Sequence, residues 1–343
     1  MGGLNRRMMT LVVALVPIVA FGLLLSAVTV PFVSLGPGPT FNTLGEVEGK
    51  EVVDIKGTEV KPTSGNLNMT TVSQSDGLTL GQALRLWMSG TEQLVPRDLV
   101  YPPDKSKDDI DKENTTDFKQ SEDSAEYAAL GYLKYPRAVT VQGVTDKGPS
   151  AGKLEDGDAI DLVDDKPVAN LDEFTALLKA TKPGDQLVVD YRRKNGELGT
   201  ATITLGKNPD RDYGFLGVGV VDAPWAPFTI DFNLANIGGP SAGLMFSLAV
   251  IDKLTTGDLN GGKFVAGTGT ITGDGKVGPI GGITHKIYAA KEAGATVFMV
   301  PAENCDEANS AHEDGLQLIK VENLTGAVDA LKTYSSGGEP PHC

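Results

Sequence analysis

The sequence predicts a multidomain protein: a single N-terminal transmembrane helix, then a β-rich α+β domain, then a C-terminal α+β domain. Three observations predict it. An uncharged apolar run lies near the N-terminus, short strands alternate with one helix in the middle, and glycine-rich turns precede apolar helices near the C-terminus. A length of 343 residues suits two or three compact units, and an apolar content of 40% allows each to bury a core.

Charge and composition exclude several classes of function. The chain has 45 acidic and 30 basic residues and a formal net charge of −15. We expect no nucleic-acid partner, because binding nucleic acid needs clustered positive charge. We also expect no metal and no cofactor, since the three histidines (His285, His312 and His342) lack metal-ligand spacing and two cysteines are too few for a zinc ribbon or an iron–sulfur cluster. Cys305 and Cys343 can pair only in an oxidising compartment, and the sequence leaves their pairing open.

The apolar run covers residues 8–30 without a charge. As a helix it is about 34 Å long, enough to cross a hydrocarbon core of roughly 30 Å. Arginines precede the run and the first charge after it is Glu46. The basic residues that flank a membrane span stay on the cytoplasmic side of the membrane. We therefore expect a cytoplasmic tail over residues 1–7, a helix over 8–30 in the lipid bilayer of the cell membrane, and an extracytoplasmic remainder.

A cleaved signal peptide is the alternative reading of this run. The apolar region of a signal peptide is about 7–15 residues long and is followed by small residues at the cleavage site. The run here is longer, and a cut after Ala27 would place Leu25 where a small residue is needed. The sequence thus favours the membrane anchor.

Residues 31–129 are expected to form an extracytoplasmic region before the second domain. Their start is rich in glycine and proline (SLGPGPTFNTLG) and cannot be helical. A charged stretch at 104–126 predicts a partly helical, solvated surface. Whether residues 31–125 form a domain of their own is left open.

Alternating strands begin at Ala138 and continue through AIDLV at 159–163. Asn170 and Glu173 predict the start of a short helix, and a hairpin follows it. This order, with LEDGDAIDLVDDKPVANLDEF at its centre, resembles a bacterial PDZ domain of the kind attached to envelope proteases, over residues 130–207. The resemblance implies that a peptide adds as a strand along an exposed sheet edge. We expect the Gly131-Tyr132-Leu133 region to line that groove.

Residues 238–255 read GGPSAGLMFSLAVIDKLT and predict a buried helix. Pro240 suits the first helical position, which places Ser241 in the first turn. Unpaired backbone N–H groups and the positive end of the helix dipole surround a hydroxyl there, and both stabilise an oxyanion. Taken alone, Ser241 is better explained as the cap of a buried helix.

Residues 278–294 read GPIGGITHKIYAAKEAG and predict a glycine turn that leads into a helix. Lys286 lies in its first turn, on one stripe with Ala289, Ala290 and Ala293. Desolvation and the helix N-terminus both lower the pKa of a lysine there, so that its amine can act as a base. A neutral lysine beside a serine hydroxyl is a nucleophile–base pair that needs no histidine. Taken alone, Lys286 is better explained as a snorkelling surface lysine.

Together, the two segments resemble the proteolytic domain of the Lon family. The resemblance is carried by GPSAGLMFSLAVIDKLT and by VAGTGTITGDGKVGPIGGITHKIYAAKEAGATVFMVPAEN, and we expect this domain over 208–335 and a tail over 336–343. In that family the serine of GPSAG is the nucleophile and the lysine after the GG turn is its base, which implies Ser241 and Lys286. The threonine of the TG-x-I element implies that Thr268 orients the lysine.

Three further features are expected to stay outside the chemistry. Ser150 lies in a second GPSAG (148–152), but no matching lysine segment follows it at the family spacing. GDLNGGKF at 257–264 has the glycines and lysine of a phosphate loop but ends in Phe264, which cannot hold magnesium. His285 adjoins Lys286, but neighbouring helix positions point about 100° apart.

The predicted function is an ATP-independent serine endopeptidase of the Lon type with a Ser-Lys dyad. It is expected to cleave unfolded or flexible envelope proteins, docked through the PDZ groove. The resemblance also allows a homo-oligomeric ring, because Lon domains often form rings. The alternative is a membrane-anchored PDZ scaffold or peptide sensor whose protease domain is inactive or cuts only itself.

Overall fold

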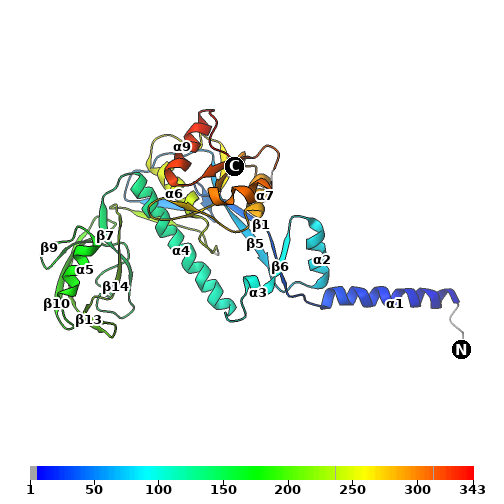
Figure 1. Ribbon diagram of the computed structural model, residues 1–343, viewed down its shortest axis with the longest axis horizontal. Coiled ribbons are helices and arrows are strands. Elements are labelled where there is room, and N and C mark those ends of the chain that lie inside the picture. The colour runs from blue at the N-terminus through cyan, green and yellow to red at the C-terminus, as the bar shows by residue number, and fades with distance from the viewer. Residues whose placement is uncertain (1–5, 236, 312) are drawn as a thin grey trace.

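The computed structural model describes residues 6–235, 237–311 and 313–343. Residues 1–5 of the predicted cytoplasmic tail and His312 lie outside the described residues. Two folded parts are visible in Figure 1, with one long helix projecting from the larger part. We call residues 137–224 the insert domain, and residues 28–136 together with 225–343 the core domain.

The projecting helix is α1 (Arg6–Ala27). Its segment Met8–Ala27 is 20 residues long, has a mean hydropathy of 2.7, and buries none of its length against the rest of the protein. This length and composition fit a membrane span or a signal sequence. The helix ends three residues before the predicted Val30, since Thr29 already forms a β-bridge with Thr79.

The core domain is built around a six-stranded mixed sheet. Its strands, in spatial order, are β20 (Gln317–Val321), β19 (Val297–Pro301), β16 (Phe264–Gly267), β5 (Asn66–Ser75), β1 (Phe32–Asn42) and β6 (Gln93–Pro96). The pairs from β20 to β5 are parallel, and β1 pairs antiparallel with both β5 and β6.

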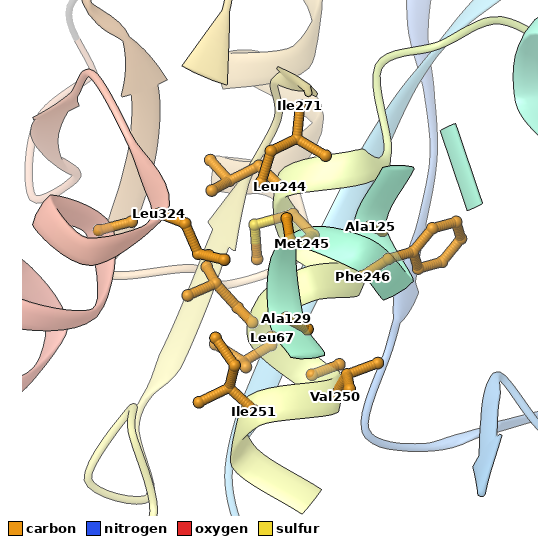
Figure 2. Close-up of a cluster of buried hydrophobic side chains, with 14 of the residues drawn as sticks. Leu67, Ala125, Ala129, Leu244, Met245, Phe246, Val250, Ile251, Ile271 and Leu324 are labelled. Atoms are coloured by element: carbon orange, nitrogen blue, oxygen red, sulfur yellow. The ribbon is translucent and has the colours of Figure 1, made fainter. Parts of the chain in front are cut away.

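Helices cover both faces of this sheet. Side chains alternate along the strands: Val297 and Met299 of β19 face one layer, and Phe298 and Val300 face the other. The first layer holds α4 (Lys107–Tyr132), α6 (Gly243–Leu254) and α9 (Leu324–Ser335); the second holds α7 (Ile283–Glu292) and α8 (Cys305–Asn309). Figure 2 shows the first layer, where α6 side chains meet Ala125 and Ala129 of α4. The result is a three-layer α/β/α domain.

Shorter elements complete the core domain. They are β2 (Glu46–Val47), β3 (Lys50–Glu51), β4 (Val53–Lys56), α2 (Leu80–Ser89), α3 (Arg97–Val100), β15 (Thr229–Phe232), β17 (Thr270–Ile271), β18 (Val277–Gly278) and the 3₁₀ turn η1 (Ala302–Asn304). Strand β15 pairs with β4, which ties the chain after the insert domain to the chain before it.

This sheet corrects the predicted organisation of residues 31–129. They do not form a region apart from the C-terminal domain, because β1 and β5 are strands of its central sheet. The charged stretch at 104–126 is indeed helical, but only its first half is solvated. Phe118 and Ala125 are buried in the second half, where α4 packs on α6.

The insert domain has its own sheet and its own core. The sheet order is β11 (Leu198–Thr204), β10 (Gln186–Arg192), β8 (Ala159–Val163), β7 (Arg137–Val144) and β14 (Val218–Pro224), with β9 (Lys166–Pro167) paired to β8. The helix α5 (Leu171–Lys179) starts at Asn170, as predicted, and packs beside a hairpin of β12 (Gly206–Asn208) and β13 (Arg211–Phe215). Both predicted boundaries, 130 and 207, shift: Leu130 is buried in the core domain, whereas β14 joins the insert sheet.

The chain enters and leaves the insert domain at one place. The ring centroids of Tyr135 and Phe228 are 5.6 Å apart, and the backbone N–H of Trp225 donates to the Pro136 carbonyl at 2.9 Å. A half-buried ion pair also joins the domains, with Lys194 Nζ 2.7 Å from Glu126 Oε1. The insert domain is therefore an insertion whose two connections lie side by side.

The C-terminal residues pack on the core domain instead of extending as a free tail. A disulfide joins Cys305 to Cys343, with the two Cα atoms 5.1 Å apart. The backbone N–H of Lys320 donates to the Pro341 carbonyl, so the last residues run beside β20. The pairing that the sequence left open is thus formed in the structure.

Replacing both cysteines with alanine is expected to lower the free energy of unfolding by about 2–4 kcal/mol, because the unfolded chain loses a loop constraint. The bonded residues lie 38 apart in sequence. Urea titration checks this, with a reductant-treated wild type that should match the double variant. A wild-type protein whose urea midpoint is the same with and without reductant would contradict the expectation.

Replacing residues 138–223 by a short Gly-Ser linker is expected to leave the core domain folded, because the two connections already touch. Deleting residues 32–75 instead removes β1 and β5 from the central sheet and is expected to prevent folding. Circular dichroism and cooperative thermal unfolding distinguish the two deletions. Loss of cooperative unfolding in the first, or its survival in the second, would contradict the domain assignment.

Candidate active site

Ser241 lies just before α6, not in its first turn as the sequence predicted. The helix begins at Gly243 and its N-cap is Ala242. The side chain of Ser241 is half-buried, whereas Ala242 is only 2% exposed. Ser241 therefore presents its hydroxyl from a short turn that the buried helix holds in place.

Contacts from two directions hold that turn. The Gly269 N–H donates to the Ser241 carbonyl at 3.0 Å, and the Leu244 N–H donates back to the Gly269 carbonyl at 3.2 Å. From α4, Ser121 Oγ donates to the Pro240 carbonyl at 3.1 Å. Gly243 allows this approach, because a Cβ there would lie 2.7 Å from a methyl of Ile271. The nucleophile candidate is thus fixed by the chain on both sides of it.

Lys286 comes from the opposite layer, in the first turn of α7. The turn before this helix needs Gly282, whose φ of 68° is in the left-handed region. The predicted stripe is buried at Lys286, Ala289 and Ala290. Ala293, the fourth member of that stripe, is exposed.

The environment of Lys286 favours a neutral amine. Its side chain is almost fully buried, and burial lowers its pKa from 10.5 to about 7. Within the described residues no carboxylate bonds to its Nζ, and the groups it bonds are two hydroxyls. Because desolvation lowers the pKa to about 7, a large fraction of this lysine is uncharged near neutral pH.

The three predicted site residues meet at the end of β16. Lys286 Nζ lies 2.7 Å from Ser241 Oγ and 2.9 Å from Thr268 Oγ1. Thr268 directly follows β16, is fully buried, and donates its own hydroxyl proton to the Ser241 carbonyl at 3.1 Å. Each layer contributes one group: the serine from the α6 side, the lysine from the α7 side, and the threonine from the sheet between them.

Backbone donors near the serine are free to bind a negative charge. In the part of the chain that the structure describes, the N–H groups of Ser241 and Ala242 donate to no protein acceptor. Free N–H groups beside a nucleophile are the parts from which an oxyanion hole is made. The site thus combines a hydroxyl, an amine of lowered pKa and two unbonded backbone N–H groups.

A cleft of about 660 Å³ opens beside these groups. Its lining includes Ser241 and Lys286 together with the apolar side chains of Met69, Phe118 and Ile237. Met69 comes from β5 and Phe118 from α4. The cleft can therefore hold an extended chain with an apolar side chain beside the hydroxyl.

Sequence reasoning missed Met69 and Phe118. Phe118, Ser121 and Ala125 recur at helical spacing within the charged stretch, which is the signal that could have identified a buried face. Met69 follows Leu67 at strand spacing, but nothing local indicates that β5 lies beside residues almost 200 positions away.

The features that the sequence set aside stay apart from the cleft. Ser150 is buried in a turn and donates to the Leu216 carbonyl at 2.6 Å. Lys263, in the phosphate-loop-like segment, bonds to the Tyr334 carbonyl. His285 is buried rather than exposed, and neither ring nitrogen has a partner among the described residues.

The predicted position of the peptide groove stays a prediction. The Gly131-Tyr132-Leu133 region ends α4 and lies beside Pro224, the last residue of the edge strand β14. An edge is formed by β14, which pairs with β7 on one side and packs against α5. Val218 and Val220 of β14 are half-buried there.

No group of three or more His, Cys, Asp or Glu side chains in the described ranges could hold a metal ion.

Comparison with protein families matches two parts of the chain. Residues 236–333 match the Lon protease (S16) C-terminal proteolytic domain, and residues 111–205 match the PDZ domain. The first match contains the three residues that meet at the cleft. The second begins within α4 and ends before β14, so it covers most of the insert domain.

Curated relatives are themselves Lon proteases. "Lon protease" of Roseiflexus castenholzii is 41% identical over 83 residues, which are 24% of this chain and 10% of that protein. "Lon protease 2" of Bacillus subtilis is 27% identical over 206 residues, which are 57% of this chain and 33% of that protein. The chain thus spans a third or less of the length of these relatives.

PDZ domains are among the solved structures that resemble part of the chain. The PDZ domain of the SdrC-like protein from Listeria monocytogenes is 27% identical and covers 24% of this chain and 87% of that one, with a TM-score of 0.23. The family matches place the two folded parts: this chain carries a PDZ domain followed by a C-terminal proteolytic domain of the Lon protease type.

Proposed function

We propose that the chain is a membrane-anchored serine endopeptidase that cleaves unfolded or flexible envelope proteins without ATP. The observation that carries this proposal is the buried pair of Ser241 and Lys286, with 2.7 Å between Oγ and Nζ. A serine hydroxyl is a weak nucleophile until a base takes its proton, and a lysine whose pKa is about 7 can do so near neutral pH.

In the first half-reaction Ser241 Oγ attacks the carbonyl carbon of the scissile peptide. The O–H bond breaks as the proton passes to Lys286 Nζ, and the carbonyl oxygen becomes an oxyanion. The N–H groups of Ser241 and Ala242 stabilise that charge. The C–N bond then breaks, and Lys286 returns the proton to the leaving amine.

In the second half-reaction a water molecule replaces the amine. Lys286 takes a proton from the water as its oxygen attacks the acyl carbon, and the new tetrahedral oxyanion meets the same backbone donors. When the bond to Oγ breaks, the proton returns to Ser241. No step of this cycle consumes a nucleotide.

Thr268 is proposed to orient the lysine. Its Oγ1 accepts from Lys286 Nζ, and its own proton goes to the Ser241 carbonyl, so one hydroxyl fixes both members of the pair. These hydrogen bonds restrict the flexible lysine side chain to the rotamer that faces Ser241.

The remaining parts support the location and the substrate class. An uncovered apolar helix of 20 residues suits a single membrane span, and the Cys305–Cys343 disulfide suits an oxidising compartment outside the cytoplasm. The open edge of β14 beside α5 suits a peptide added as a strand, which would deliver flexible segments to the protease. A homo-oligomeric ring stays a prediction.

Ser241→Ala and Lys286→Ala are each expected to reduce cleavage of an unfolded fluorescent casein, without nucleotide, by at least about 10³-fold. The matched control is Ser150→Ala, which removes the serine of the other GPSAG and should keep activity. Lys286→Arg should also be inactive, because a guanidinium does not give up its proton. Cleavage that survives Ser241→Ala would refute the assignment.

The same assay separates the alternative reading. A PDZ scaffold or sensor with an inactive protease domain leaves casein intact in the wild type as well. A self-processing chain leaves casein intact but shows a mass loss in intact-mass spectra, which Ser241→Ala abolishes.

The value of kcat/KM is expected to rise with pH and to level off above about pH 7, the pKa of Lys286 in the folded protein. The sign follows from the role, because the active form is the neutral amine and protonation at lower pH removes it. Below this pKa the profile should fall about tenfold per pH unit. A flat profile between pH 5 and 9 would exclude Lys286 as the base.

Thr268→Val is expected to lower kcat by about 10–100-fold, the loss of one hydrogen bond to the base. KM should change little, since the threonine is buried behind the pair. Thr268→Ser keeps the hydroxyl and should restore most of the activity. A Val variant as active as the wild type would remove Thr268 from the site.

A further inference from the structure

Exposed apolar side chains gather on one part of the core domain. Beyond α1, most of the large apolar side chains that the described residues expose belong to the segment from 28 to 99. Apart from Val60, they are Val28, Phe32, Leu84, Trp87, Met88 and Leu99. Trp87 is 68% exposed and Met88 and Leu99 are each 75% exposed, although such residues normally lie inside a soluble domain.

The helix α2 carries the centre of this surface. Leu84, Trp87 and Met88 are spaced i, i+3 and i+4, so they form one outward stripe. Ala83, on another side of the helix, is buried against the protein. A capping box between Thr79 and Gln82 starts α2, and Gly90 ends it. The stripe is therefore presented by a well-formed helix.

The same helix is fixed beside the outer end of α1. The Leu80 N–H donates to the Val28 carbonyl at 2.8 Å, and the Val30 N–H donates to the Leu78 carbonyl at 2.9 Å. A Cβ on Gly81 would lie 3.1 Å from the Leu25 carbonyl oxygen. In Figure 1, α2 lies across the direction of α1 where α1 meets the core domain.

We propose that α2 docks flat on the outer surface of the bilayer that α1 spans, with Leu84, Trp87 and Met88 inserted among the lipids. This inference rests on the proposed anchoring by α1. A helix that lies across a spanning helix, at the span's outer end, is in the plane of the interface. Amphipathic helices bind there through an apolar stripe, and tryptophan is enriched at that depth.

The composition of α2 fits this partner. Arg85 is its one charged residue, and it lies beside the stripe, where a long cationic side chain can reach the lipid headgroups. The helix α2 itself contains no Asp or Glu, so it brings no carboxylate to the anionic surface of a bilayer.

Docking would also set the direction of the cleft. Thr71 and Val72 of β5 line the cleft, and the same strand ends at Ser75, only a few residues before α2. A helix held on the bilayer therefore fixes the cleft relative to the membrane surface, which α1 alone, as a single connection, does not.

The test uses the full chain in nanodiscs of phosphatidylcholine, with and without bromine on the acyl chains. The chain has two tryptophans, and Trp225 is only 3% exposed in the interior. Brominated lipid is expected to quench part of the wild-type tryptophan emission. Trp87→Phe should abolish the quenching by brominated lipid and leave the emission of Trp225 unchanged.

A matched control places a tryptophan at Leu198, which is 79% exposed on the PDZ domain, in the Trp87→Phe background. Its emission should not depend on bromine. Failure of the chain to elute with the nanodisc would refute the anchoring itself. A chain that elutes with it but shows no quenching of Trp87 would overturn only the docking; blue-shifted yet unquenched emission would assign the stripe to a second copy of the chain.

Discussion

The rest of the core domain depends on the complete burial of α6. Every residue from Gly243 to Lys253 is buried, so the helix has no face that can meet water. It needs cover on all sides, which the sheet, α9 and α4 supply together. Because α4 and the strands β1 and β5 precede the PDZ domain, α6 is covered by chain from both sides of that domain in the sequence.

Burial of α6 also determines the electrostatics of the site. The helix and its glycine contacts leave Ser241 at the rim of a dry interior, and Lys286 reaches it from the other layer. A charged amine there is disfavoured, and no carboxylate within the described residues bonds to it. The low pKa of Lys286 therefore comes from the packing of two helix layers on one sheet. A lysine in the same motif on an open surface would stay protonated.

Local patterns in the sequence predicted the site better than the fold. The glycine turns, the buried helix and the spacing from Ser241 to Lys286 lie within short segments, and the structure brings these residues together with Thr268. The central sheet could not be predicted in this way, since β5 pairs with β16 across most of the chain. The buried face of α4 was also not predicted, because it consists largely of small residues such as Ala125 within a highly charged stretch. The edge strand β14 followed a predicted boundary and was assigned to the wrong domain.

The last residues, 341–343, lie along the edge of the central sheet and protect it; we call them the strap. β20 is the outermost strand, and without the last residues its backbone would present a row of unpaired groups to any other chain. Ile319 bridges His342, and Cys343 donates to the Leu318 carbonyl, so the strap occupies that row. The disulfide reinforces these backbone contacts, and a reducing environment leaves only the backbone contacts to hold the strap. Protection against strand-to-strand aggregation is in this way coupled to the redox state of the compartment in which the chain matures.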